Sequence, residues 1–231
     1  MLIKAVVFDI GQTLVYYPFP LNWSALYRPA FEHVEKQNGL RLSEEEYAHI
    51  LNVLAKYNTR IHPREKEVSS DQIFSEILEG TSIPKERMQS VKEDFYGFFR
   101  GEARIYPEAE ETLKELLSRD ILTATLSDVP YGMDNRFALE DIAPLIPYIT
   151  SPCTSNDTGY RKPSREGLRV LSEKIGVTPS EIVFVGDEKK DIECAKSAGA
   201  AAVLINRTDT PKDYGQDDTI GSLDEIFDIL K

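Results

Sequence analysis

The chain of 231 residues has few of the residues that build disulfide-linked or zinc-binding proteins. It contains two cysteines, Cys153 and Cys194, and three histidines, His33, His49 and His62. Two cysteines are too few for a disulfide framework, and neither residue type recurs at the spacing of a zinc site. We therefore expect both cysteines to be reduced and structural, and the histidines to serve surface or packing roles.

The sequence also lacks long apolar runs and an excess of basic residues. No stretch approaches the roughly 20 apolar residues of a membrane-spanning helix, and the N-terminal MLIKAVVFD is too short and too soon acidic for a signal peptide. With 39 acidic against 27 basic residues, the formal net charge is -12, which disfavours general binding to nucleic acid or to an anionic membrane. These features predict a cytoplasmic protein with a small-molecule partner, and they leave monomer and homodimer open.

The residues that are present describe a globular protein. Hydrophobic residues make up 41% of the chain, enough for one domain or for one domain with an insertion. Short apolar runs rich in β-branched residues, without polar alternation, are typical of strands in a parallel sheet covered on both faces. Such runs occupy residues 3–8, 121–126, 148–150, 182–185 and 201–205.

Amphipathic helical patterns lie between the later apolar runs. They cover residues 107–119, 164–175 and 188–198. A last helix is expected to begin at Ser222, where Glu225 completes the pattern of a capping box. Because strand and helix alternate from about residue 104 onward, we predict an α/β fold with a doubly wound, mostly parallel sheet.

Residues from about 20 to 100 follow a different pattern, with one helix after another. The segments LSEEEY and SSDQIFSEIL are clear helix starts, and aromatic residues recur at helical spacing, which indicates a helical core. We expect an α-helical insertion at residues 18–103 within an α/β core formed by residues 1–17 and 104–231. The expected hinges are Pro18, Phe19, Pro20 and Gly101.

Polar residues follow the predicted strands at the edge where ligands of doubly wound sheets bind. They are Asp9, Ser127, Asp128, Asp187 and Asp191, joined by Lys162 in the loop TGYRKPS. Carboxylates gathered at one edge repel one another unless a cation lies among them. The sequence therefore predicts a site for a hard, oxygen-seeking metal ion such as Mg2+.

Four short motifs carry a family resemblance. The segments FDIGQTL, TLSD, GYRKP and VGDEKKD, in this order and at strand ends, resemble the four motifs of the haloacid dehalogenase (HAD) superfamily, most of whose members are Mg2+-dependent phosphatases. Each motif alone is weak evidence, whereas four in order at strand ends are specific. The resemblance covers residues 1–17 and 104–206, and it implies a Rossmann-like HAD core with residues 18–103 as a helical cap inserted after the first motif.

The resemblance implies a role for each matching residue. Asp9 would attack phosphorus and form an aspartyl-phosphate. Mg2+ would be bound by the carboxylates of Asp9 and Asp187 and by the backbone carbonyl of Gly11. Asp191 would hold a metal-bound water or orient Lys162. Glycine at position 11 is expected to let the backbone approach the metal and the phosphate.

Two further motif residues would act on the phosphoryl group. Ser127 would donate a hydrogen bond to its oxygens, and Lys162 would neutralise the charge that grows in the transition state. Each has an ordinary alternative when taken alone, because Asp9 and Ser127 are common turn residues and Lys162 would be a solvated lysine. Thr13 would support the loop after the nucleophile.

Gly11 is also where this sequence departs from the family pattern. Most phosphatases of the superfamily carry there a second aspartate, which protonates the leaving alcohol and later activates water. Such acid–base help is worth ~10²–10⁴-fold in rate. Three interpretations follow: water or a cap residue supplies the proton, the substrate has a good leaving group such as an acyl phosphate, or the protein is a weakly active or non-catalytic binding protein. The neighbouring Gln12 cannot act as an acid at neutral pH.

The sequence thus predicts a Mg2+-dependent phosphohydrolase for a small phosphorylated metabolite. Haloacid dehalogenation is a rival activity, but dehalogenating relatives need no metal and lack a paired acidic last motif such as Asp187 and Asp191. The cap would supply specificity. Candidate contacts of the cap with an anionic substrate, each otherwise a solvated helix end, are Arg28, Arg60, His62 and Arg64.

Overall fold

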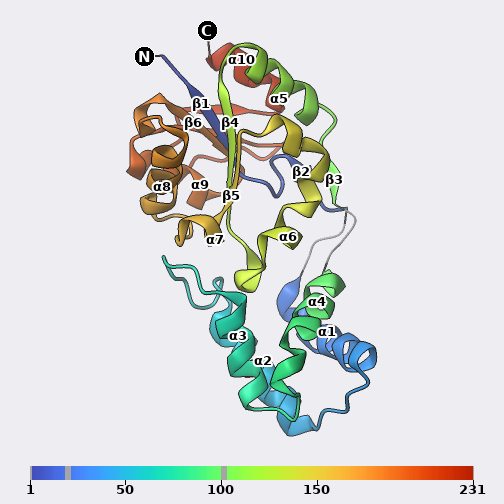
Figure 1. The fold of residues 1–231 in the computed structure, drawn as a ribbon. Coiled ribbons are helices and arrows are strands. Elements are labelled where there is room, and N and C mark those ends of the chain that lie inside the picture. Colours follow the sequence, from blue (N-terminus) through green and yellow to red (C-terminus); the bar gives the residue numbers. More distant parts are fainter. Residues whose placement is uncertain (1, 19–21, 100–102, 231) are drawn as a thin grey trace.

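A parallel β-sheet forms the centre of the larger part of the molecule. The computed structural model describes residues 2–18, 22–99 and 103–230. Six strands pair in the order β5-β4-β1-β6-β7-β8, and every neighbouring pair is parallel (Figure 1). These strands are β1 (Ala5–Phe8), β4 (Leu122–Ser127), β5 (Ser151–Thr154), β6 (Ile182–Gly186), β7 (Ala201–Ile205) and β8 (Asp218–Ile220). The predicted doubly wound α/β class is confirmed.

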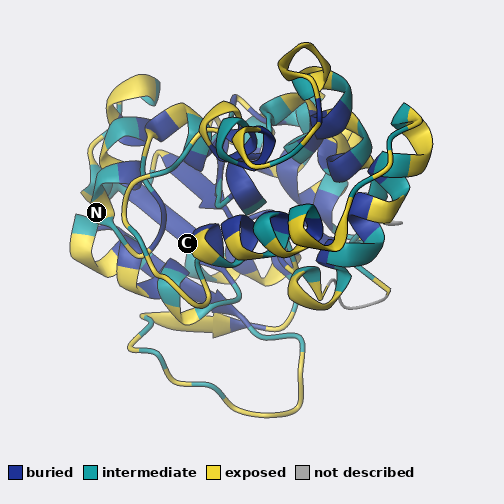
Figure 2. Ribbon diagram, turned by 90° about the horizontal axis from the view of Figure 1, so that it is seen from below, coloured by how far each residue is buried: buried dark blue, intermediate teal, exposed yellow. Residues whose placement is uncertain are grey.

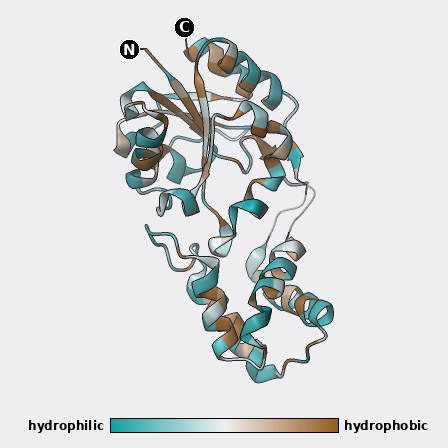
Figure 3. Ribbon diagram, in the orientation of Figure 1, coloured by the Kyte–Doolittle hydropathy of each residue, from teal (hydrophilic) through white to brown (hydrophobic). Residues whose placement is uncertain are grey.

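Both faces of the sheet are covered, which explains why its strands read as continuous apolar runs. In β1, Val6 and Phe8 join a buried cluster on one face, while Ala5 and Val7 join a cluster on the other. The first face packs on α5 (Ala109–Ser118), η3 (Glu140–Tyr148), η5 (Leu223–Glu225) and α10 (Ile226–Ile229). The second packs on α8 (Arg165–Ile175) and α9 (Lys189–Ala198). Figure 2 shows the buried strands between these layers, and Figure 3 shows their apolar character.

Four of the five predicted strands are present, and the fifth is displaced. Residues 148–150 are not a strand, because Tyr148 ends η3 and β5 begins only at Ser151. Strand β5 contains Pro152 and lies at the sheet edge, where a missing N–H is tolerated. The short β8 and the antiparallel pair of β2 (Val15–Tyr16) and β3 (Arg104–Ile105) were not predicted.

The core helices follow the predicted patterns at most of their ends. Helices α8 and α9 end at Gly176 and Gly199, both in the left-handed conformation that glycine adopts without strain. The capping box predicted at Ser222 is wrong. The Ser222 hydroxyl donates to Asp224 instead, and Glu225 accepts from the Gly221 N–H. This segment forms only the short helices η5 and α10.

Helices α1 (Trp23–Asn38), α2 (Glu44–Tyr57), α3 (Ser70–Glu79) and α4 (Met88–Phe99) form the smaller part (Figure 1). The capping box of Ser43 and Glu46 starts α2 as predicted. These four helices share a buried cluster separate from the two sheet clusters. Phe19, Pro20 and Gly101 lie outside the described residues, and the domain boundaries stay predictions. Across the described ranges, none of the helices has the length and apolarity needed to span a bilayer.

Core segments also enter the helical part. The segment after β4 forms η2 (Pro130–Gly132) and α6 (Asn135–Ala138), and Tyr131, Met133 and Phe137 belong to the buried cluster of the cap helices. A Cβ at Gly132 would lie 2.2 Å from the Val68 carbonyl oxygen, so only glycine fits this close approach. The remaining described elements are η1 (Lys85–Arg87), just before α4, and further along α7 (Ser155–Thr158) and η4 (Pro179–Glu181).

Candidate active site

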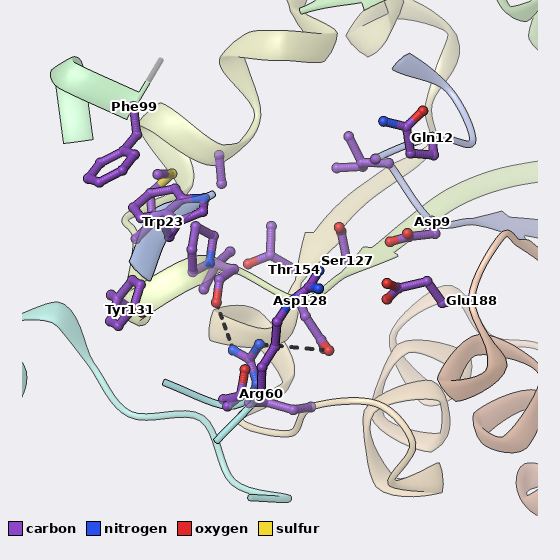
Figure 4. A pocket seen from close by; sticks show the side chains of 18 of the residues that line it. Asp9, Gln12, Trp23, Arg60, Phe99, Ser127, Asp128, Tyr131, Thr154 and Glu188 are labelled. Carbon is purple, nitrogen blue, oxygen red and sulfur yellow. Dashed lines mark hydrogen bonds and ion pairs between the residues drawn. The ribbon is translucent and has the colours of Figure 1, made fainter. Parts of the chain in front are cut away.

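The strand ends bring the predicted motif residues to one edge of the sheet. Asp9 follows β1, Ser127 ends β4, and Asp187 follows β6. Strands β4, β1 and β6 are neighbours and parallel, so their carboxyl ends meet at the same edge. A pocket of about 700 Å³ opens here, lined by residues of these strand ends and of the helical part (Figure 4).

Lys162 lies between two of the carboxylates. Its ammonium is 2.8 Å from Asp9 Oδ1 and 2.6 Å from Asp191 Oδ1, and all three residues are buried. Although burial opposes the charge, Asp191 and Asp9 raise the pKa of Lys162 well above its usual value. Burial would raise the pKa of Asp9, but Lys162 and Lys190 lower it below its usual value. At neutral pH this site therefore holds an ionised Asp9 beside a charged lysine.

Asp187 completes a cluster of carboxylates that is not fully neutralised. One oxygen each from Asp9, Asp187 and Asp191 lie within 4.8 Å of one another. Burial, then the charges of Asp9 and Asp191, raise the pKa of Asp187 to about 7. Asp191 Oδ2 accepts a hydrogen bond from the Glu188 N–H at 2.9 Å, whereas Oδ1 forms an ion pair with Lys162 at 2.6 Å. Hard oxygen donors with excess negative charge fit a divalent cation such as Mg2+.

Two glycines at the site differ in what the fold demands of them. A Cβ at Gly186 would lie 2.5 Å from the Asp191 side chain, so glycine is needed for the carboxylate to pack over the end of β6. At Gly11, a Cβ would meet only Tyr17 Cε2 at 3.9 Å, an ordinary contact. Packing therefore does not require a glycine at position 11, and the expectation that Gly11 lets the backbone approach a metal and a phosphate stays a prediction.

Ser127 and Gln12 flank the carboxylate of Asp9 in the pocket. Lys162 and then Lys190 lower the pKa of Asp9 most, and Ser127 at the end of β4 adds a smaller lowering. Gln12 has a left-handed backbone with φ of 56°, and its Oε1 accepts a hydrogen bond of 3.4 Å from the Tyr106 hydroxyl. Ser127 is thus placed to donate to an oxygen near Asp9, and Gln12 is oriented from outside the pocket.

Of the four cap residues predicted to contact an anion, only Arg60 lines the pocket. Arg28 pairs with Glu44 at 2.6 Å on the surface. Arg64 donates to the Tyr57 carbonyl at 2.7 Å and pairs with Glu67. His62 is exposed and is not among the lining residues. Local partners or position keep Arg28, His62 and Arg64 away from this pocket, and their predicted contact with an anionic substrate stays a prediction.

Two other cations line the pocket, and the sequence reasoning did not select them. Arg161 donates to the Val129 carbonyl at 2.7 Å and contacts Glu67 of the cap. Lys190 lies 3.4 Å from Asp128. Both residues stand inside the quoted motifs GYRKP and VGDEKKD, so motif position was the available signal.

Backbone as well as side-chain contacts join the cap to the loop that carries Lys162. Lys66 and Tyr160 form an antiparallel bridge, flanked by a hydrogen bond from the Arg161 N–H to the Glu65 carbonyl at 2.7 Å. The Glu67 carboxylate also accepts from Ser155 at 2.6 Å. The cap segment therefore holds the residues immediately before Lys162.

Aromatic side chains form the far wall of the pocket. Trp23 stacks on Phe99 with ring centroids 3.7 Å apart, and Tyr131 lies 5.5 Å from Trp23. Figure 4 shows these three rings across the pocket from Asp9. The pocket thus has a charged end at the sheet and an apolar end in the cap.

A parallel sheet whose strand ends gather an aspartate–lysine pair and a carboxylate cluster beneath inserted helices defines a class of hydrolase. The model of the family described as haloacid dehalogenase-like hydrolase matches residues 3–199. The chain belongs to this family.

Curated relatives share about a quarter of the aligned residues. The phosphoglycolate phosphatase of Salmonella paratyphi A is 24% identical over 157 residues, which cover 63% of this chain and 58% of the relative. That of Escherichia coli K12 is 25% identical over 52% of this chain and 49% of the relative. The match thus spans only about half the length of these proteins. The glyceraldehyde 3-phosphate phosphatase of Methanocaldococcus jannaschii is 27% identical over 100% of this chain and 98% of the relative.

Solved structures share the fold over nearly the whole chain. A 2-haloacid dehalogenase from Pseudomonas syringae has a TM-score of 0.69 at 21% identity and covers 99% of this chain and 98% of its own. A HAD phosphatase from Thermococcus onnurineus has a TM-score of 0.63 at 22% identity, with the same coverage. At these identities the likeness concerns the fold alone.

Proposed function

We propose that the protein is a Mg2+-dependent phosphohydrolase acting on a small phosphorylated metabolite. The observation that carries the proposal is the buried pair of Asp9 and Lys162 at 2.8 Å, with Asp187 beside it. Relatives named phosphoglycolate phosphatase and glyceraldehyde 3-phosphate phosphatase support phosphoryl chemistry. The pocket of about 700 Å³ suits a small substrate with its phosphate at the sheet edge.

In this proposal Asp9 is the nucleophile. Its lowered pKa keeps the carboxylate ionised at neutral pH, so an oxygen is ready to attack phosphorus and form an aspartyl-phosphate. Lys162 neutralises negative charge that shifts among the phosphoryl oxygens, and Ser127 donates a hydrogen bond to one of them. Water then hydrolyses the aspartyl-phosphate and regenerates Asp9.

The chain offers ligands for the metal ion of this reaction. Asp9, Asp187 and the carbonyl of Gly11 would bind Mg2+, while Asp191 orients Lys162, since its Oδ1 lies 2.6 Å from the Lys162 ammonium. Bound Mg2+ would neutralise charge on the transferring phosphoryl group. Arg60, Arg161 and Lys190 line the pocket; in this proposal Arg60 contacts anionic parts of the substrate from the cap.

One observation favours a second candidate, a non-catalytic or weakly active binding protein. Gly11 leaves the usual acid–base position without a carboxylate. The deciding assay is hydrolysis of p-nitrophenyl phosphate with and without Mg2+, by the wild type and by Asp9→Asn. Turnover that needs both Mg2+ and Asp9 supports the phosphohydrolase, whereas turnover no higher than that of the variant favours the binding protein.

The same preparations test the dehalogenase alternative. Protein stripped of metal with EDTA is incubated with 2-chloropropionate, and chloride release is measured. Chloride release without metal would favour the dehalogenase, in which Asp9 attacks carbon, over the phosphohydrolase. A panel of phosphorylated sugars, nucleotides, glycolate and acyl phosphates then identifies the substrate class of an active enzyme.

A further inference from the structure

The space beside Gly11 is bordered by one aromatic ring. A side chain at position 11 would point toward Tyr17, whose Cε2 lies 3.9 Å from the position of a Cβ. The chain reaches this point because it turns sharply after Asp9. Gly11 forms a bridge with Val15, and β2 then carries Tyr17 back alongside the loop. Tyr17 therefore stands next to the place where the family's second aspartate would project.

Tyr17 is hydrogen-bonded to a carboxylate that is distant in sequence. Its hydroxyl donates to Asp141 Oδ2 at 2.7 Å, and Asp141 lies on η3, 124 residues further along the chain. Both side chains are half-buried, and both line the pocket together with Asp9 and Gly11. Burial, and then the charge and hydrogen bond of Asp141, raise the pKa of Tyr17 far above its usual value, and the charge of Asp9 adds to this.

We propose that Tyr17 and Asp141 form a proton relay that replaces the missing aspartate of position 11. The inference rests on the proposed phosphohydrolase function and adds two residues to it. Tyr17 is the group that contacts the leaving-group oxygen, and Asp141 is the group that stores the proton. Neither residue belongs to the four family motifs.

The relay balances over one catalytic cycle. In the first step Asp9 forms a bond to phosphorus and the bond to the leaving-group oxygen breaks. This oxygen takes the proton of the Tyr17 hydroxyl, which takes the carboxylic proton of Asp141, so the products are an alcohol, neutral tyrosine and an Asp141 carboxylate. The Tyr17 hydroxyl and Asp141 Oδ2 lie 2.7 Å apart, a distance that lets a proton pass between them in this step.

In the second step water attacks the phosphorus of the aspartyl-phosphate, and the bond from phosphorus to Asp9 breaks. The water proton passes to the Tyr17 oxygen, and the hydroxyl proton of Tyr17 passes to Asp141. Phosphate leaves and the starting state is restored. Tyr17 stays neutral throughout, which suits a residue surrounded by negative charge.

The test compares substrates whose leaving groups differ in their need for a proton. Ethyl phosphate releases a strongly basic alkoxide, whereas p-nitrophenyl phosphate releases a stable phenolate. We expect Tyr17→Phe and Asp141→Asn to lower kcat/KM for ethyl phosphate by about 100-fold, within the range of acid catalysis, and to lower kcat/KM for p-nitrophenyl phosphate less than about threefold. The value of kcat/KM reports only the steps up to departure of the leaving group. A slow later hydrolysis of the aspartyl-phosphate therefore does not mask the difference between the two substrates.

Tyr16→Phe is the matched control, since Tyr16 is the neighbouring tyrosine on β2 and does not line the pocket. It should leave kcat/KM for both substrates unchanged. Equal losses on the two substrates after Tyr17→Phe would mean a structural role and would overturn the relay, as would no loss on either. Thermal unfolding of each variant separates such a loss from misfolding.

A double variant tests whether the proton is delivered in the open space beside Gly11. A Cβ fits there, so Gly11→Asp combined with Tyr17→Phe should recover at least tenfold of the lost kcat/KM for ethyl phosphate. No recovery would contradict the assignment of this space to the proton donor. If the wild type shows no Mg2+-dependent and Asp9-dependent turnover, the proposed function itself fails, a result distinct from equal losses on the two substrates.

Discussion

Replacing Asp187 by asparagine is expected to stabilise the metal-free protein at alkaline pH and to reduce its stabilisation by Mg2+. The pKa of Asp187 is raised from 3.8 to about 7 by burial and by neighbouring carboxylates. A raised pKa means that folding favours the protonated acid. Below pH 4 the residue is protonated in both states and costs nothing. As the pH rises toward 7, only the unfolded state releases the proton, so the folded state loses stability.

The size of the effect follows from the shift. Each pKa unit corresponds to about 1.4 kcal/mol, so the shift of Asp187 sets an upper limit of about 4 kcal/mol above pH 7. Asp187 remains partly exposed, and solvent screening lowers this figure. We expect Asp187→Asn to gain about 2 kcal/mol in the free energy of unfolding at pH 8, and almost nothing at pH 4.

Urea unfolding followed by tryptophan fluorescence measures this free energy in EDTA at pH 4, 6 and 8. Asp209→Asn is the control, because Asp209 is an exposed carboxylate in the loop after β7. In parallel, Mg2+ at 100 times its dissociation constant should stabilise the wild type by about 2.7 kcal/mol and Asp187→Asn far less. If the variant is no more stable than the wild type at pH 8, the carboxylate cluster does not carry the excess charge inferred for it.

Two further predictions concern cations at the site. Lys162→Met should lower kcat by at least ~10²-fold. It should also destabilise the fold by about 3 kcal/mol, because Asp9 and Asp191 lose a buried counter-charge. A variant that is as stable in urea unfolding and as active in turnover assays as the wild type would refute the paired arrangement. Arg60→Ala should raise KM about tenfold, the value of one charged hydrogen bond. Arg28→Ala removes only a surface ion pair and should leave KM unchanged. Equal effects of the two changes on KM in steady-state kinetics would argue against a role of Arg60 in substrate binding.

The sequence was sufficient to predict four of the six strands of the sheet and the polar residues that follow them. The apolar runs of β1, β4, β6 and β7 are buried on both faces. Such runs can be recognised as strands from their composition, without knowing which strands they pair with. Asp9 and Asp187 follow two of these strands directly, and neighbouring parallel strands bring their ends together. Local pattern and general topology therefore fix the charged end of the pocket.

The remainder of the site depends on contacts between distant segments. Tyr17 meets Asp141 across 124 residues and Arg161 meets Glu67 across 94, and neither pairing has a local signal. Arg28 and Arg64 were chosen as basic residues of the cap, but an acidic protein offers carboxylates to neutralise them nearby. Strand β5 was misplaced because the apolar run at residues 148–150 precedes it, whereas the residues of the strand itself, SPCT, do not form an apolar run.

The segment after β4 limits how freely the helical layer could be replaced by that of a relative. Tyr131, Met133 and Phe137 complete the interior of the helical layer, yet the same stretch continues directly from Ser127 at the end of β4. A helical layer transplanted from a relative would have to bring its own version of residues 129–137, or its interior would be left with unfilled volume. The inserted helices and this stretch consequently form one unit of change, so new specificities should be engineered in both together.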